Sequence, residues 1–181
     1  MKHLVTAAAV VLFLPVLLLA YKSGPGPRVT GGFGEPTCVQ CHQGQPPGDR
    51  ALKIDAPRSY RRGGTYDVRV TLARPGLEVG GFALSARYRS GAVEGKQAGE
   101  LHAVDSRASV VTEGDVQYAQ QTEEGSRADA AGKLTWVLTW KAPSNWTGDV
   151  IFHVAANASN ADESALGDHV YTAHAVTRPG R

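Results

Sequence analysis

Beyond its first twenty residues, the sequence has no long hydrophobic run and no stretch with the helical period of 3.6 residues. It has two cysteines and a single methionine, Met1, so it is not a disulfide-rich scaffold. The formal charge is only +2, and no basic strip carries interleaved aromatic residues, which argues against a nucleic-acid partner. No nucleophile triad and no phosphate-loop pattern is present. What remains is a chain of 181 residues, about one domain in size, with frequent glycine and proline.

The first twenty residues have the pattern of an export signal. Lys2 and His3 form a short polar start, and residues 4–20 are uncharged and mostly apolar. A run of about 17 residues is short for a bilayer span and long for a signal core. Two alternatives therefore stay open for residues 1–20, a signal peptide cleaved after Ala20 or an uncleaved N-terminal membrane anchor. Both predict an exported protein, periplasmic or extracellular, and the second tethers it to the membrane through residues 4–20.

Residues 38–42 read C-V-Q-C-H, the C-x-x-C-H signature of haem c attachment. The spacing lets two thiols reach the two vinyl groups on one porphyrin edge, and the histidine that follows is the proximal iron ligand. Zinc would need further ligands, and a thioredoxin-like motif would need a βαβ pattern. A Cys38–Cys41 disulfide stays open as an alternative. The sequence thus predicts one covalent haem c, held by Cys38, Cys41 and His42, in an attachment segment over residues 37–50.

The sixth position of that iron has several candidate ligands. Met1 lies in the export signal, so no methionine of the exported part is available. The candidates are a non-histidine side chain, water, no ligand, or one of four histidines: His102, His153, His169 and His174. His169 and His174 are five residues apart on a predicted strand, so their side chains point to opposite faces and at most one of them meets a given haem.

Apolar and polar residues alternate with a period of two from about Ile54 onward. The clearest runs are residues 66–72, 82–88, 134–140, 150–156 and 168–176, with weaker strands expected between Glu100 and Gln121. Each run is bounded by Gly, Pro, Asn or Asp. This pattern predicts an all-β fold, an antiparallel immunoglobulin-like sandwich over residues 51–178. Trp136 and Trp140 share a face with two leucines, so we expect them in the core.

The segments that flank the motif and the strands differ in composition. Residues 21–36 are dense in glycine and proline, which predicts a flexible, exposed tether. The loop from Asn157 to Asp168 is rich in side-chain oxygens, which is typical of turns and also of calcium sites. Basic residues, Arg87 among them, dominate from Arg50 to Arg89, and acidic ones dominate from Glu94 to Asp129. That segregation is typical of a solvated surface; the alternative is a basic rim for an acidic redox partner or for haem propionates.

Several short segments resemble, in order, a family of exported bacterial proteins with a reeler-like β-sandwich, the choice-of-anchor V type. They are residues 31–42, 63–68, 81–86, 140–143 and 156–171, so the resemblance covers about Gly31 to Val176. It implies an immunoglobulin-like, reeler-like sandwich with a haem-attachment loop at its N-terminal edge. Many relatives carry a Tyr-x-x-His-Thr segment, and in the matching residues 118–122 Gln121 replaces the histidine. If that histidine is the distal ligand in relatives, the resemblance implies weak or exchangeable distal ligation here.

Together these features predict an exported mono-haem c-type protein that transfers electrons or binds a small ligand or redox substrate at its iron. We expect an electron carrier or a binding module rather than an enzyme, with a redox protein as its partner. The alternative is an extracytoplasmic β-sandwich recognition module for a protein or polymer, in which haem is only structural or absent.

Overall fold

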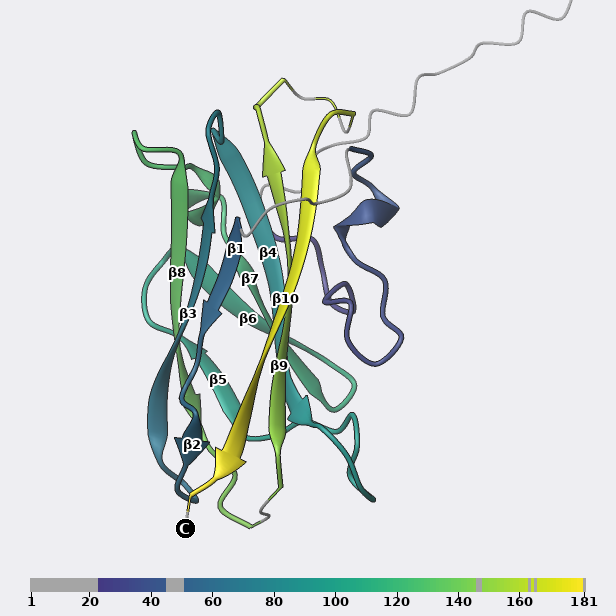
Figure 1. Ribbon diagram of the computed structural model, residues 1–181, viewed down its shortest axis with the longest axis vertical. Coiled ribbons are helices and arrows are strands. Elements are labelled where there is room, and N and C mark those ends of the chain that lie inside the picture. The colour runs from purple at the N-terminus through teal and green to yellow at the C-terminus, as the bar shows by residue number, and fades with distance from the viewer. Residues whose placement is uncertain (1–22, 45–50, 146–147, 163, 165, 181) are drawn as a thin grey trace, which may run out of the picture.

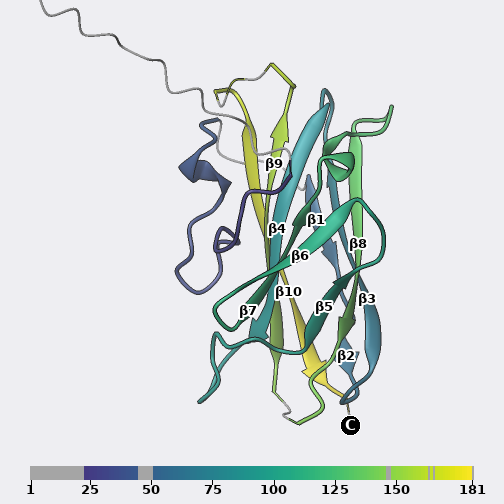
Figure 2. The ribbon, with the colours of Figure 1, turned by 180° about the vertical axis from the view of Figure 1, so that it is seen from behind.

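Two β-sheets pack face to face in the computed structural model, which describes residues 23–44, 51–145, 148–162, 164 and 166–180 (Figures 1 and 2). These residues form strands and short 3₁₀ turns, and none of them is in an α-helix. Within the same ranges no helix is long and apolar enough to cross a bilayer. The predicted export signal, residues 1–20, lies outside the described residues, as do residues 45–50 of the predicted attachment segment.

The secondary-structure elements are 3₁₀ turns, labelled η, and strands, labelled β, numbered in chain order. They are η1 (Cys38–Gln40), β1 (Leu52–Asp55), β2 (Ser59–Tyr60), β3 (Thr65–Ala73), β4 (Val79–Tyr88), β5 (Glu100–Ala103), β6 (Ala108–Glu113), β7 (Val116–Gln121), η2 (Glu124–Ser126), β8 (Lys133–Lys141), β9 (Val150–Ser159) and β10 (His169–Pro179). One sheet has four strands in the order β1-β3-β8-β5, and the other has six in the order β2-β10-β9-β4-β7-β6. β2 pairs with β10 in parallel, and the other pairs between these strands are antiparallel.

The core between the sheets follows from strict alternation along the strands. In β8 every second side chain is buried, and Trp136 and Trp140 are both 0% exposed. The Trp136 ring stacks on Phe82 of the opposite sheet with ring centroids 4.5 Å apart. Each indole N–H donates to a backbone carbonyl, that of Gly125 for Trp136 and that of Ala98 for Trp140. The prediction that both tryptophans belong to the core is confirmed.

The predicted all-β sandwich is confirmed, and its strands fall where alternation is strong. The five clear runs are β3, β4, β8, β9 and β10, and the weaker strands expected between Glu100 and Gln121 are β5, β6 and β7. The alternation did not reveal β2, because two residues are too few to show a period. The parallel pairing of β2 with β10 also departs from the expected all-antiparallel arrangement.

Residues 23–44, here called the covering segment, lie against the outer face of the six-stranded sheet, the face turned away from the core (Figures 1 and 2). The sequence predicts an exposed tether over residues 21–36. In the described part of that range, Thr30 is 1% exposed and Gly32 lies directly over the His153 ring, where a Cβ would have no room. Glycine lets this backbone approach the sheet side chains closely, which is why a turn-rich composition forms a packed layer here.

Candidate functional site

The C-x-x-C-H motif forms a single helical turn at one end of the six-stranded sheet. Thr37 caps the turn, since its hydroxyl accepts from the backbone N–H of Val39 at 3.4 Å. The N–H groups of Cys41 and His42 both donate to the carbonyl of Cys38, at 3.2 and 2.9 Å. This turn places both thiols and the imidazole within one short stretch, as attachment to a single porphyrin edge requires.

The two thiols of the turn are free and differ in their surroundings. Cys38 is 8% exposed and packs against Ala155 of β9 and Val170 of β10, whereas Cys41 is exposed. Burial is the main reason why the pKa of the Cys38 thiol rises to about 12. The disulfide considered from the sequence is not formed. Cys41 is therefore the accessible thiol, and Cys38 is the one that anchors the turn to the sheet.

Two polar side chains hold His42: Asn157 of β9 and Asp168, the residue directly before β10. Its Nδ1 lies 2.5 Å from Oδ2 of Asp168, which is 1% exposed. Nδ2 of Asn157 lies 3.1 Å from the same carboxylate oxygen. The imidazole keeps 30% of its side-chain surface exposed. With Nδ1 engaged, Nε2 is the nitrogen that is free to bind a metal.

The chain after His42 is fixed to the loop that carries Asp168. Gln43 forms a parallel bridge with Leu166, and the Gly167 N–H donates to the Gln43 carbonyl at 2.8 Å. Gly44 passes so close to the Asp168 carbonyl that a Cβ at this position would collide with it. His42 is thus held against Asp168 by backbone contacts as well as by its side chain.

This donor set fits a c-type haem. A proximal histidine needs one ring nitrogen for iron and a partner that orients the other, and His42 with Asp168 has this arrangement. Two thiols in reduced form lie on the same turn. Val39 and Leu166 are exposed apolar side chains, at 59% and 65%. Val39 belongs to the same turn, and Leu166 pairs with Gln43, the residue after His42. The residues that would hold the group are therefore Cys38, Cys41 and His42.

The four candidate distal histidines lie on different surfaces. His102 is on β5, the edge strand of the other sheet, 3.5 Å from the exposed Glu100 carboxylate. His169 stacks on Tyr171, a core residue, and so faces away from the outer face. His153 and His174 are register partners on the outer face, with ring centroids 6.1 Å apart. Only the last two share a face with Asn157 and hence with His42.

His153 is enclosed by the covering segment. Phe33 meets its ring edge-on at 5.3 Å, and its Nδ1 has no hydrogen-bond partner among the described residues. Burial, followed by the nearby His174 and Arg87, lowers the pKa of His153. A neutral imidazole with an open nitrogen is a competent ligand, but the structure brings it into no contact with His42.

Gln121 takes part in the sheet instead of facing open space. It is 5% exposed, and its Oε1 accepts from the Phe82 N–H at 2.9 Å. Its amide lies over Gly81, the register partner of Asn157. Gln121 is therefore one strand away from Asn157, a side chain that holds His42.

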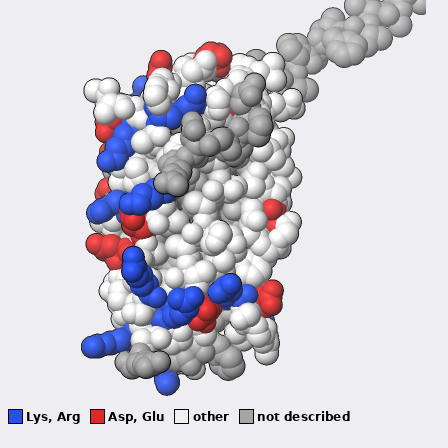
Figure 3. All heavy atoms as spheres, in the orientation of Figure 1, with Lys and Arg blue, Asp and Glu red and all other residues white. Residues whose placement is uncertain are grey.

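Three of the basic residues in the described part of residues 50–89 lie away from the surface of the site, whereas Arg74 lines a small hollow with Gly167 and His169. Arg87 is buried, with 7% of its side chain exposed, and pairs with Glu35 of the covering segment. Arg61 and Arg62 follow β2, at the opposite end of the sandwich, because β10 begins beside Asp168 and ends beside β2 (Figure 1). Figure 3 shows basic side chains along the left edge and lower end of one face, around an uncharged middle. This placement favours the solvated-surface interpretation of the charge segregation.

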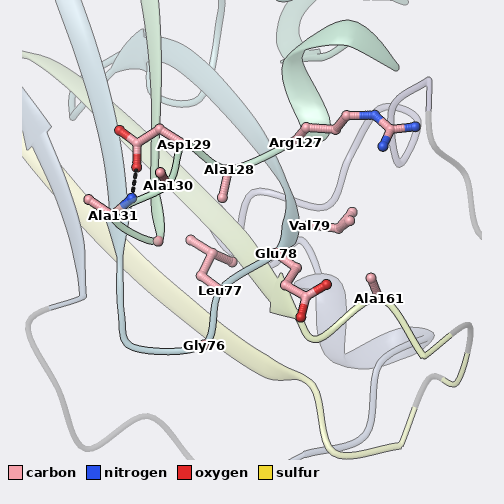
Figure 4. A pocket seen from close by; sticks show the side chains of 11 residues that line it. Gly76, Leu77, Glu78, Val79, Arg127, Ala128, Asp129, Ala130, Ala131 and Ala161 are labelled. Carbon is pink, nitrogen blue, oxygen red and sulfur yellow. Dashed lines mark hydrogen bonds between the residues drawn. The ribbon is translucent and has the colours of Figure 1, made fainter.

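A hollow of about 580 Å³ lies beside the loop between β9 and β10, the loop that ends at Asp168 (Figure 4). It is bounded by the start of β4, the loop before β8 and Ala161. Its lining is mostly alanine and glycine, with Glu78, Arg127 and Asp129 as the charged residues. The Asp129 carboxylate accepts a hydrogen bond from the backbone N–H of Ala131 at 3.0 Å, so it stabilises the loop that carries it.

Comparison with known proteins shows the fold. No family model matches the chain, and no curated protein matches it in sequence. The human F-spondin reeler domain is similar, with a TM-score of 0.50 and 20% identity over 76% of this chain and 96% of that one. The fold is reeler-like. A second structure of the human F-spondin reeler domain is also similar, with a TM-score of 0.46 and 21% identity over 65% of this chain and 82% of that one. So is a cohesin module of a family 33 glycoside hydrolase from Clostridium perfringens, with a TM-score of 0.45 and 11% identity over 71% of this chain and 96% of that one.

Sequence reasoning singled out Cys38, Cys41 and His42 but missed the partners of His42. Asp168 and Asn157 were noticed only as members of an oxygen-rich loop. Within the described residues no group of three His, Cys, Asp or Glu side chains is placed to hold a metal ion. One signal was available in the sequence: Asp168 directly precedes a strand with apolar residues on both faces, so its carboxylate is expected to be buried. A buried carboxylate needs a hydrogen-bond partner.

Proposed function

We propose that the protein is an exported reeler-like module that carries one covalent haem c on the outer face of its six-stranded sheet. Cys38 and Cys41 would form the thioethers, and His42 would be the proximal ligand. The observation that carries this proposal is the His42–Asp168 contact of 2.5 Å, which engages Nδ1 and leaves Nε2 for iron. A metal-ligating histidine almost always donates its other ring N–H to a carboxylate, a carbonyl or water, and the buried Asp168 is such a partner for His42.

The bound haem would supply one-electron exchange and a site for small ligands. The role of the chain is to hold and orient it. Asp168 and Asn157 fix the imidazole, the buried Cys38 would tie one thioether to β9 and β10, and the exposed Cys41 would form the other at the surface. A haem held by a thiol at the surface would be within reach of a partner protein, so electron transfer is the function that we favour.

A recognition module is the second candidate, and the hollow beside β4 favours it. It is an open hollow of about 580 Å³ at the surface, where part of a protein or polymer would lie. The likeness to F-spondin's reeler domain supports the sandwich and says nothing of haem. In this alternative the chain binds a protein or polymer at the sandwich end, and haem is structural or absent.

The two candidates are separated by producing the full chain in a bacterial host, with and without a haem c maturation system. Electron transfer or ligand binding at haem predicts a haemochrome spectrum with one haem per chain and a haem that survives denaturing gels. Protein that is exported and folded but colourless under both conditions would favour the recognition module. The ferrous spectrum with and without carbon monoxide then divides electron transfer, which tolerates a closed sixth position, from ligand binding, which needs an open one.

A further inference from the structure

We propose that Asp168 is a positioning residue for the iron: it holds His42 as the Nδ1–H tautomer and, through it, shifts the bound iron toward the ferric state. This inference rests on the haem attachment proposed above and goes beyond it, because it assigns a function to a residue outside the C-x-x-C-H motif. It concerns the strength of the proximal ligand, whatever occupies the sixth position.

The hydrogen-bond geometry fixes which atoms donate. Nδ1 of His42 and Nδ2 of Asn157 both lie near Oδ2 of Asp168, at 2.5 and 3.1 Å. A carboxylate oxygen only accepts, so Nδ1 must carry a proton to bond it. The Nδ1 to Nδ2 distance of 3.1 Å then follows from two donors that converge on one oxygen. In the neutral ring this leaves Nε2 without a proton and with its lone pair directed outward.

The carboxylate has little other compensation. Asp168 is 1% exposed, and its Oδ1 has no partner among the described residues. In the part of the chain that the structure describes, its one ion-pair partner is His42, and no Lys or Arg side chain pairs with it. A buried carboxylate acts on its neighbours through a low local dielectric, so its interaction with His42 is much stronger than the same contact at a surface.

The effect on iron follows from ligand basicity. A metal-bound histidine coordinates the metal through one ring nitrogen. A carboxylate that accepts a hydrogen bond from the other ring nitrogen raises the basicity of the coordinating one. A more basic ligand stabilises the more highly charged metal, so the ferric state gains relative to the ferrous state. A neutral carbonyl at the same place would have a weaker effect. Asp168 is therefore expected to lower the reduction potential of the iron, apart from any effect of the sixth ligand.

The first test needs no haem. In the folded apoprotein at a pH where His42 is neutral, nitrogen NMR of the ¹⁵N-labelled ring should show a single Nδ1–H tautomer. Asp168→Asn should convert it to a mixture, and Asp162→Asn, which alters an exposed carboxylate of the same loop, should leave it unchanged. A mixture of tautomers in the wild type would overturn the proposal, and this result does not depend on how well any variant folds.

The second test is a redox titration of the haem-loaded proteins. At a fixed applied potential, Asp168→Asn should shift the ferrous to ferric ratio at least tenfold toward ferrous, which for one electron is about 59 mV. Asp162→Asn should change it less than twofold, and Asp168→Glu, which keeps the charge, should stay closer to wild type than Asp168→Asn. Equal ratios in all four proteins would overturn the inference while haem attachment stands. Absence of covalent haem from the wild type would instead overturn the proposed function.

Discussion

Glu35 and Arg87 form an ion pair that is almost completely buried, with 9% and 7% of their side chains exposed. They are 52 residues apart in the chain and join the covering segment to the C-terminal end of β4. The Tyr118 hydroxyl completes the group: it donates to Glu35 at 2.6 Å and accepts from Arg87 at 2.6 Å. The Glu35 carboxylate also accepts from Thr30 at 2.6 Å. This cluster holds the covering segment, and with it the C-x-x-C-H motif, against the sheet.

Glu35→Gln should destabilise the protein, because it leaves the buried Arg87 without a counter-charge. Loss of one partner from a buried pair costs about 3–5 kcal/mol. Glu113→Gln is the matched control, since Glu113 lies 4.0 Å from Arg28 and both are more than half exposed; its effect should stay within about 1 kcal/mol. Urea unfolding of the three proteins measures both values. Equal midpoints would show that the Glu35–Arg87 pair does not stabilise the fold.

The same pair predicts a loss of stability in acid. Burial raises the pKa of Glu35, but hydrogen bonds from Thr30, Tyr118 and Arg87 outweigh it, so the pKa lies below its usual value of 4.5. A lowered pKa in the folded state contributes stability that is fully present above pH 4.5 and is lost as the pH falls through the lower value. The wild type should therefore lose more stability than Glu35→Gln between pH 5 and pH 3. Parallel pH profiles would contradict this assignment.

Trp136→Ala should cost about 3–5 kcal/mol, the usual range for removal of a large aromatic side chain from a core. Trp136 is 0% exposed, stacks on Phe82 and bonds the Gly125 carbonyl. Val137→Ala, on the opposite face of the same strand and only partly buried, is the control and should cost much less. Thermal unfolding followed by circular dichroism gives the comparison. A melting temperature unchanged by Trp136→Ala would contradict the core assignment.

The strands and the core could be predicted because alternation is a local signal. Side chains two residues apart on a strand, such as Trp136 and Leu138, point to the same side of the sheet, so their spacing in the sequence already indicates the buried face. The packing of the covering segment could not be predicted in this way. Its glycines suggest a tether, and the contacts that hold it, from Glu35 to Arg87 and from Gly32 to His153, join residues far apart in the chain.

Cys41 and Cys38 should react at very different rates with a thiol reagent in the folded, reduced apoprotein. Cys41 is exposed, whereas burial raises the pKa of Cys38 to about 12, and the thiolate is the reactive form. At pH 8, mass spectrometry should find one fast label on Cys41 and a second on Cys38 only after denaturant is added. Rapid labelling of both in native buffer would show that Cys38 does not pack against Ala155 and Val170.

Reduced, haem-loaded protein should bind carbon monoxide, because Gln121 stands where the resemblance seen in the sequence implies a histidine, and an amide oxygen is a weak ligand for haem iron. Gln121→His introduces an imidazole in place of that weak ligand, so it should convert the iron to low spin. Ferrous absorption spectra of the wild type, of this variant and of the four single His→Ala variants make the comparison. A low-spin wild type that becomes high-spin in one of those four identifies that histidine as the distal ligand and refutes the prediction.

The motif itself could be predicted, but its partners could not. Cys38, Cys41 and His42 are adjacent in sequence, and their spacing carries the chemistry. Asp168 lies 126 positions further on, and only the fold brings its carboxylate to His42. The same holds for the distal histidines: alternation shows that His169 and His174 face opposite ways, but the pairing of β9 with β10 is needed to place His174 beside His153.

The most direct test of the account is the intact mass of the full chain made with a haem c maturation system, measured after denaturation. We expect the wild type to be heavier than its polypeptide by one haem. The Cys38→Ala, Cys41→Ala double variant, which keeps His42 and Asp168, should have the mass of the bare polypeptide. A wild type with the bare polypeptide mass would contradict haem attachment.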